Sequence, residues 1–170
     1  MRGSMQRWKR VAMATAVVTG SVVAAIGGTA PASGAAPTTG PGPTAQHCAV
    51  RVIGKLPSGE LRTTAPVCST TQAEAVRATG ATAADSMIGI HFDGPAYTGA
   101  AFEVVGADCT GGWLNINALW TNRVSSTMNG CPRIRHFDGY NLTGDSETTV
   151  YPGGNLITLN NRTNSIQYLP

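Results

Sequence analysis

Over residues 87–170 the apolar residues fall in short runs separated by turn residues. Ile88, Ile90 and Phe92 alternate with other residues, which predicts a strand with one side in a core. Turn signals such as Asp138-Gly139 recur along the whole segment. Many short strands, regular turns and no helical period predict an all-β sandwich or small barrel.

The preceding segment, 48–86, has a different pattern. Residues 49–54 alternate loosely and predict a strand, and 57–59 (Pro-Ser-Gly) predict a turn. Thr71 and Glu74 have the spacing of a capping box, which predicts one short helix before Gly80. We expect an N-terminal extension made of a strand and a short helix. It could be a subdomain, an ornament on the main domain or a pro-segment.

The start of the chain has the layout of a secretory signal peptide, here residues 1–35. An uncharged run, 11–26, follows four basic residues, and small residues suited to cleavage lie near 32–35. A membrane anchor is the alternative, but the run is short and diluted by Gly and Thr. Residues 36–47 form a Pro/Gly/Thr linker. We therefore predict a secreted protein with no membrane span in its mature form.

Removal of the leader changes the charge of the protein. The full chain has 12 Lys and Arg and 9 Asp and Glu, a net charge of +3. Four of the basic residues precede residue 36 and all the acids follow it, so the mature chain carries 8 − 9 = −1. No basic patch then remains to attract nucleic acid.

Four cysteines follow the leader, and in an oxidising compartment they favour disulfides. Three pairings are possible. We favour Cys48–Cys68 and Cys109–Cys131, since each closes a local loop of about 20 residues, worth roughly 3 kcal/mol. A zinc site is the rival interpretation, but no Cys-x-x-Cys pair occurs and the histidines are scattered.

The tetrapeptide His-Phe-Asp-Gly occurs at 91–94 and again at 136–139. Each copy is followed at equal spacing by a large apolar residue and then a Gly. Later parts of the two halves also align, which predicts two units of about 40 residues and suits paired four-stranded Greek keys. The two histidines occupy equivalent positions, and we expect them to be structural, not a metal pair.

These residues resemble the βγ-crystallin family. The hairpin signature of this family is an aromatic residue, any four residues, a second aromatic residue, any one residue and then Gly. Residues Phe92 to Gly99 of the first unit match this signature. Residues Phe137 to Gly144 of the second unit match it except that Leu142 replaces the second aromatic residue. The Gly takes a backbone conformation closed to larger residues. The resemblance covers about residue 87 to 169 and implies a sandwich of two Greek keys.

The calcium loop of this family is Asn/Asp, Asn/Asp, two variable residues, Ser/Thr, Ser. Residues 121–126 fit it except at Thr121, and 160–165 fit it except at Asn164. The resemblance implies that each loop also uses an Asp of the other unit's hairpin. The implied ligands are Asn122, Arg123, Ser125 and Asp138 for one site, and Asn160, Asn161, Arg162, Asn164 and Asp93 for the other.

Calcium takes oxygen ligands, and with few formal charges in each site we expect weak binding, at a Kd of about 10⁻⁴–10⁻³ M. The alternative is that the polar residues only bond the backbone and lock the loops. We expect a binding module that is not catalytic, because no nucleophile elbow or supported acid–base pair occurs. We also expect it to be a monomer.

Two other functions stay open. The stretch 119–126 followed by Cys131 is similar to secreted bacterial metalloproteinase inhibitors of the same fold, which implies a secreted protease as partner. Antifungal crystallin-like domains share the fold too, which implies a cell-wall glycan. Trp113 and Trp120 could form a sugar platform if their indoles are exposed.

Overall fold

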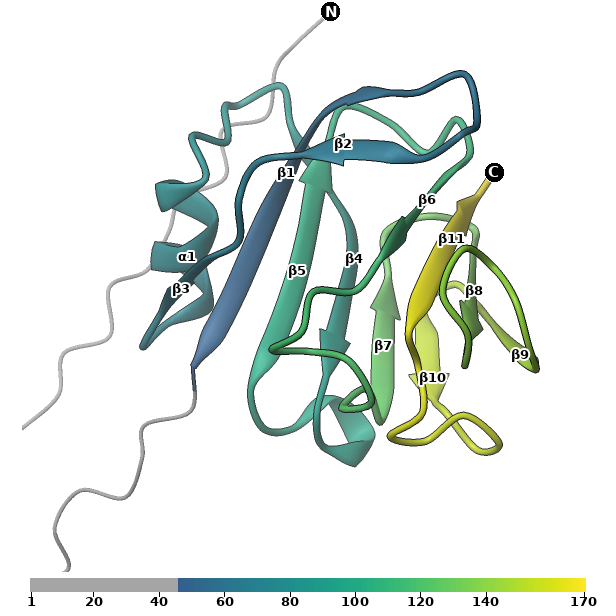
Figure 1. The fold of residues 1–170 in the computed structure, drawn as a ribbon. Coiled ribbons are helices and arrows are strands. Elements are labelled where there is room, and N and C mark those ends of the chain that lie inside the picture. Colours follow the sequence, from purple (N-terminus) through teal and green to yellow (C-terminus); the bar gives the residue numbers. More distant parts are fainter. Residues whose placement is uncertain (1–45) are drawn as a thin grey trace, which may run out of the picture. The chain divides into compact units, whose positions relative to one another are not determined.

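A computed structural model describes residues 46–170, so the predicted signal peptide and most of the predicted linker lie outside the described residues. The described chain is mainly β, with two sheets and one short helix (Figure 1). Its elements are β1 (His47–Lys55), β2 (Leu61–Thr63), β3 (Val67–Ser69), α1 (Gln72–Ala78), β4 (Ser86–Phe92), the 3-10 turn η1 (Pro95–Tyr97), β5 (Ala101–Gly106), β6 (Gly112–Asn115), β7 (Ser126–Asn129), β8 (Arg133–Phe137), β9 (Ser146–Val150), β10 (Gly153–Asn155) and β11 (Ser165–Leu169).

The two sheets exchange strands. The first has the order β10-β7-β4-β5-β1-β2, with β3 also paired to β1, and the second has the order β6-β11-β8-β9. In each repeat three strands share one sheet, and the third strand along the chain joins the other sheet: β6 pairs with β11, and β10 pairs with β7. The predicted all-β class is confirmed.

The core lies between the sheets and contains apolar residues from both, among them Val104 of β5 and Ile166 of β11. The predicted alternation along β4 is broken, because the register shifts between Met87 and Gly89. Ile88 joins the main core, whereas Ile90 and Phe92 lie in a separate small cluster with Ala101. The expectation that these three residues face one core is therefore wrong.

Beyond that bulge, the residue of β4 that reaches between the sheets is His91. Its Nε2 lies 3.0 Å from the Tyr168 hydroxyl and its Nδ1 lies 2.9 Å from Thr127 Oγ1. His136 of the second repeat meets it edge-on, with ring centroids 5.4 Å apart. Both imidazoles are fully buried. The structural role expected for the two histidines is confirmed.

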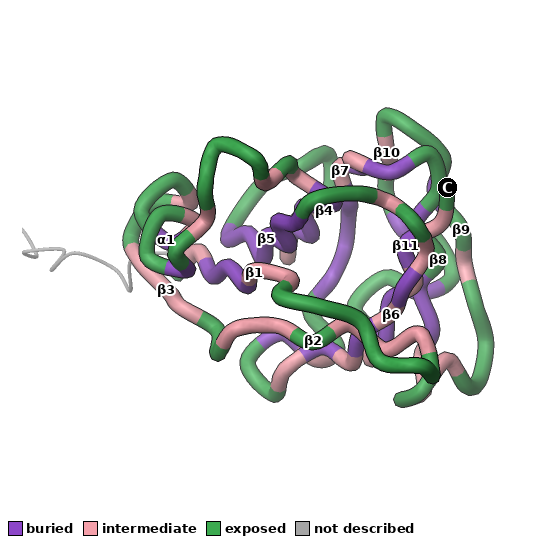
Figure 2. The backbone as a smooth tube through the Cα atoms, turned by 90° about the horizontal axis from the view of Figure 1, so that it is seen from above, coloured by how far each residue is buried: buried purple, intermediate pink, exposed green. Residues whose placement is uncertain are grey.

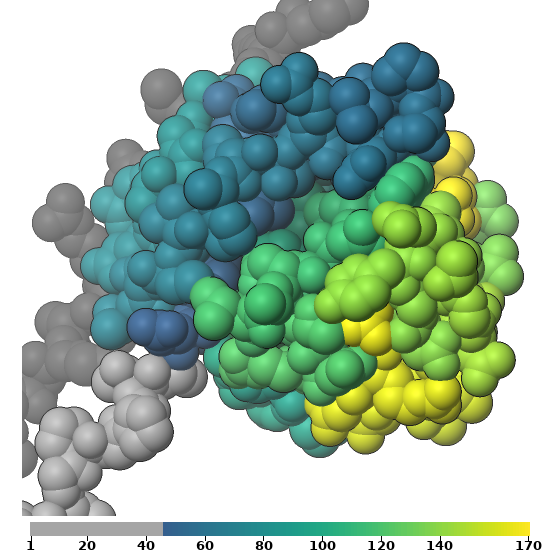
Figure 3. All heavy atoms as spheres, in the orientation of Figure 1, coloured from purple at the N-terminus to yellow at the C-terminus, as the bar shows by residue number. Residues whose placement is uncertain are grey.

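The N-terminal extension joins the first sheet. β1 runs parallel to β5, and Figure 2 shows its buried first half beside that strand. Figure 3 shows blue residues of this segment lying against green residues of the sandwich. The Thr71 side chain accepts a bond from Glu74 N, so the predicted helix and its N-cap are confirmed. The proposed domain boundary at residue 86 stays a prediction.

Both favoured disulfides, Cys48–Cys68 and Cys109–Cys131, are present. The first joins the paired strands β1 and β3, and the second ties the loop before β6 to the turn after β7. Within residues 46–170, no helix has the length and apolar character needed to cross a membrane.

Candidate functional site: two polar loops facing two folded hairpins

The β4–β5 and β8–β9 hairpins fold over in the same way. Each has two consecutive residues with positive φ, Ala96 and Tyr97 in one and Asn141 and Leu142 in the other. In the first, the rings of Phe92 and Tyr97 lie 5.8 Å apart. A Gly with φ near +80° closes each hairpin, and any Cβ on Gly99 would collide with the Asp93 carboxylate. The family-like spacing therefore has a local steric cause.

The polar loops 121–126 and 160–165 pack against each other. Asn122 N donates to Thr163 O, and Asn161 N donates to Val124 O, at 3.0 and 2.9 Å. Asn122 and Asn161 both have positive φ, near 57°, where Asn is better tolerated than most residues. The pairing brings each loop to the hairpin of its own repeat and to the end of the other loop.

In the first cluster the Ser125 hydroxyl lies between two carbonyl oxygens. Ser125 Oγ is 3.0 Å from the Asp93 backbone oxygen and 3.0 Å from Asn161 Oδ1. A hydroxyl has one hydrogen, so it can donate to only one of them at a time. Three oxygens thus converge with a single hydrogen among them, which is a suitable beginning of a hard-cation site.

The second cluster has Asn164 in the place of the serine. Its Nδ2 donates to the Asp138 backbone oxygen at 2.5 Å, and its Oδ1 is buried with no hydrogen-bond partner among residues 46–170. A buried carbonyl oxygen without a partner is costly unless something else coordinates it. The second cluster therefore also has one oxygen in excess of its donors, and this fits a bound cation.

Each cluster also contains an arginine that pairs with the hairpin carboxylate. Arg123 Nη2 lies 2.7 Å from Asp93 Oδ2, and Arg162 Nη2 lies 2.5 Å from Asp138 Oδ2. The other oxygen of each carboxylate accepts a backbone N–H across the hairpin neck, at 2.8 Å in both cases. One carboxylate and one guanidinium leave the first cluster with no net charge. In the second cluster Asp145 Oδ2 also lies 3.7 Å from Arg162 Nη2, which adds one exposed carboxylate. With so little formal charge in either cluster, attraction for a dication is weak.

The grouping of the ligands differs from the one that the resemblance implied. Asp93 lies with Arg123 and Ser125 of the first loop, and Asp138 lies with Arg162 and Asn164 of the second. The contribution from the opposite repeat is Asn161, which reaches Ser125. The side chains of Asn122 and Asn160 make no hydrogen bond among the described residues and are exposed. The described residues hold no group of three or more His, Cys, Asp or Glu suited to a metal.

The two tryptophans do not make an exposed platform. Trp120 is fully buried, with its ring 5.8 Å from that of Phe102 and the Arg123 guanidinium 4.6 Å above it. The Trp113 indole donates to Ser58 O at 3.2 Å, which holds β6 to the β1–β2 turn. These indoles therefore serve the core and a strand contact.

Sequence reasoning missed the role of Glu147 on β9. Its carboxylate accepts backbone N–H bonds from Ile157, Thr158 and Leu159, at 2.8 to 3.0 Å. Burial alone would raise the pKa of Glu147, but these N–H groups and the Thr158 hydroxyl lower it. The fixed loop presents Ile157, whose exposed fraction is 84%. A lone Glu in a strand offers no sequence signal for such a contact.

Comparisons with protein-family models, with curated proteins and with solved structures found no match for this chain.

Proposed function

We propose that the chain is a secreted, non-catalytic domain of the βγ-crystallin type whose two polar loops bind calcium weakly. Calcium would hold each loop against its hairpin. The two disulfides support an oxidising compartment. The predicted signal peptide supports export.

The strand order supports two interlocked Greek keys. In the first repeat β4, β5 and β7 share a sheet while β6 pairs with β11. In the second, β8, β9 and β11 share a sheet while β10 pairs with β7. Two paired, four-stranded Greek keys are the arrangement that the resemblance implies.

The observation that carries the calcium proposal is the position of the Ser125 hydroxyl between Asp93 O and Asn161 Oδ1. The unpartnered Asn164 Oδ1 supports a second, weaker site. These residues would supply neutral oxygens, and the hairpin carboxylates would supply the charge that favours a dication.

Calorimetric titration of the oxidised, calcium-stripped protein tests the proposal. We expect a Kd of about 10⁻⁴–10⁻³ M. At ten times the Kd, calcium should stabilise the fold by about 1.4 kcal/mol, visible as a rise in Tm. A flat titration with an unchanged Tm at 10 mM calcium would remove the proposal.

Ser125→Ala and Ser126→Ala make a matched pair of variants. Ser126 Oγ donates to Gly94 O at 2.7 Å and only fastens the hairpin. Ser125→Ala should abolish the heat of the first site, whereas Ser126→Ala should lower the Tm and keep the calcium response. Equal calcium binding by the two variants would assign the heat to some other place.

The proteinase inhibitor is a second candidate, favoured by one observation. Inhibitors present a rigid loop, and the Glu147 carboxylate fixes the loop that exposes Ile157. Stoichiometric inhibition of a secreted metalloproteinase, lost in Ile157→Asp and kept in Val150→Asp, would establish it. The buried Trp120 gives no support to the glycan platform.

A further inference from the structure

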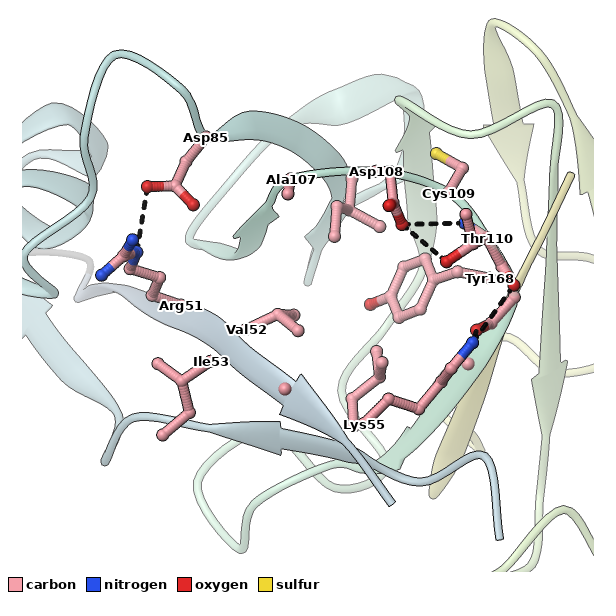
Figure 4. A pocket seen from close by; sticks show the side chains of 15 residues that line it. Arg51, Val52, Ile53, Lys55, Asp85, Ala107, Asp108, Cys109, Thr110 and Tyr168 are labelled. Carbon is pink, nitrogen blue, oxygen red and sulfur yellow. Dashed lines mark hydrogen bonds and ion pairs between the residues drawn. The ribbon is translucent and has the colours of Figure 1, made fainter. Parts of the chain in front are cut away.

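A cavity of about 490 Å³ lies where β1 parts from β5 (Figure 4). The two strands pair only from Cys48 with Phe102 to Arg51 with Val105, and beyond that β1 pairs with β2 alone. The opened wedge has the size of a small-molecule site, roughly 300–1,000 Å³. None of its lining residues belongs to the polar loops, so it is independent of the calcium proposal.

The walls of the cavity are fixed. Lys55 Nζ donates to the backbone oxygens of Thr110 and Gly111, at 3.3 and 2.8 Å, and so joins the end of β1 to the loop before β6. On the next side, Trp113 N donates to Gly59 O at 3.1 Å. Because these hydrogen bonds hold β1 and the loop before β6 in place, binding would need little reorganisation.

Part of the cavity is apolar. Ile88 and Tyr168 are almost fully buried, and Val52 and Leu61 line it beside them. Ile53 also lines the cavity, yet its exposed fraction is 55%. An apolar group placed in the wedge would remove the exposed parts of Val52, Ile53 and Leu61 from water and gain hydrophobic free energy.

The cavity is lined by equal numbers of basic and acidic side chains. Arg51 Nε lies 2.9 Å from Asp85 Oδ2, and Lys55 and Asp108 stand at the other end. Hydrogen bonds from Thr82 lower the pKa of Asp85, and those from Thr110 lower the pKa of Asp108. Both carboxylates are ionised at neutral pH, so the lining has no net charge. It offers donors and acceptors together, which suits an amide better than an ion of one sign.

The backbone of β1 also favours a peptide as the ligand. From Val52 to Lys55, β1 has no strand partner on its β5 side within the described residues. Such an open strand edge is a template for a peptide backbone, whose N–H and C=O groups alternate.

We propose that this cavity binds a short extended peptide carrying a large apolar side chain. Its backbone would lie along the open edge of β1, and its side chain would contact Val52, Leu61 and Ile88. The cavity would thus recognise a ligand by the amides of its backbone and by one apolar side chain.

Methyl NMR of the intact, oxidised protein tests this with two matched probes, acetyl-Leu-Leu-amide and acetyl-Ser-Ser-amide. Both carry the same backbone, and only the first carries apolar side chains. We expect the leucine probe to shift the Ile88 and Leu61 methyl signals saturably, and the serine probe to bind at least tenfold more weakly. Absence of saturation at 5 mM, or equal binding of both probes, would overturn the proposal.

Ala107→Trp and Ala118→Trp supply the control. Both alanines are exposed, but only Ala107 lines the cavity. Ala107→Trp should abolish the shifts, whereas Ala118→Trp should leave them unchanged. The methyl signals of Leu159, a core residue that does not line the cavity, report whether each variant is folded. Unaltered binding by folded Ala107→Trp would place the probe elsewhere and overturn the assignment.

Discussion

At the scale of single residues, the buried histidines connect the core to pH. Thr127 Oγ1 donates to Ile90 O and so accepts from His91 Nδ1, which leaves His91 Nε2 to accept from the Tyr168 hydroxyl. His136 Nδ1 is buried and has no hydrogen-bond partner in the part of the chain that the structure describes. Burial lowers the pKa of both imidazoles, that of His91 further through the charge of His136, and that of His136 to about 4. The network thus has room for neutral rings only.

Acid should therefore destabilise the fold as the pH falls below 6.5. A depressed histidine pKa means that the unfolded chain takes up protons first, so stability is complete above pH 6.5 and falls as the pH drops towards 4. For His136 alone the loss across this window is about 3 kcal/mol. Urea unfolding at pH 7.5 and 4.5 measures it. His136→Gln should make the profile shallower and leave the part that His91 contributes. A wild-type profile that is already flat would contradict the assignment.

The arginines of the polar loops compete with calcium at the same scale. In Arg123→Gln the Asp93 carboxylate loses its cation, so calcium should bind the first site about tenfold more tightly, in line with the charge dependence of such sites. The calcium-free fold should lose about 1 kcal/mol, because the pair is partly exposed and the guanidinium also covers Trp120. Calorimetry of Arg123→Gln beside Arg133→Gln checks both effects, and unchanged affinity would show that Arg123 does not oppose the cation.

At the scale of elements, Glu147 links β9 to the loop after β10. Glu147→Gln removes the charge that three backbone N–H groups share, and hydrogen bonds to a charged group contribute about 1.5–3 kcal/mol. We expect the amides of Ile157 and Leu159 to exchange hydrogen at least tenfold faster, while those of β8 do not change. Exchange mass spectrometry measures this, with Glu60→Gln as control. Uniform exchange across the variant would point to global loosening instead.

The elements that sequence reasoning predicted are those with local causes. The cap at Thr71, the turn at Gly59 and both disulfides depend on residues close in the chain. The bulge near Gly89 could not be predicted, because it arises where Ile134 and Tyr168 of the facing sheet leave no space for a Cβ. The spacing of polar residues was enough to predict the two polar loops. The residues that contact each loop could not be predicted, because they depend on how the two repeats pack together.

At the scale of the whole molecule, the N-terminal extension completes the first sheet. β1 covers one edge of β5, and its buried residues Ala49 and Val50 pair in register with Glu103 and Val104. Residues 87–169 alone would leave that edge and part of the core open to water. An open parallel edge also invites pairing with other chains.

We therefore expect a chain truncated to residues 86–170 to lose cooperative unfolding or to aggregate. The double variant Cys48→Ala, Cys68→Ala in the full chain separates two causes, because it removes the disulfide and keeps β1. It should cost about 3 kcal/mol, the chain-entropy value for a 20-residue loop. The truncation should cost more, since it also exposes apolar area along β5. Calorimetric melting of the three proteins measures both effects. The truncated chain could melt cooperatively, with a Tm no lower than that of the double variant. That result would mean that the extension is an ornament on an independent domain.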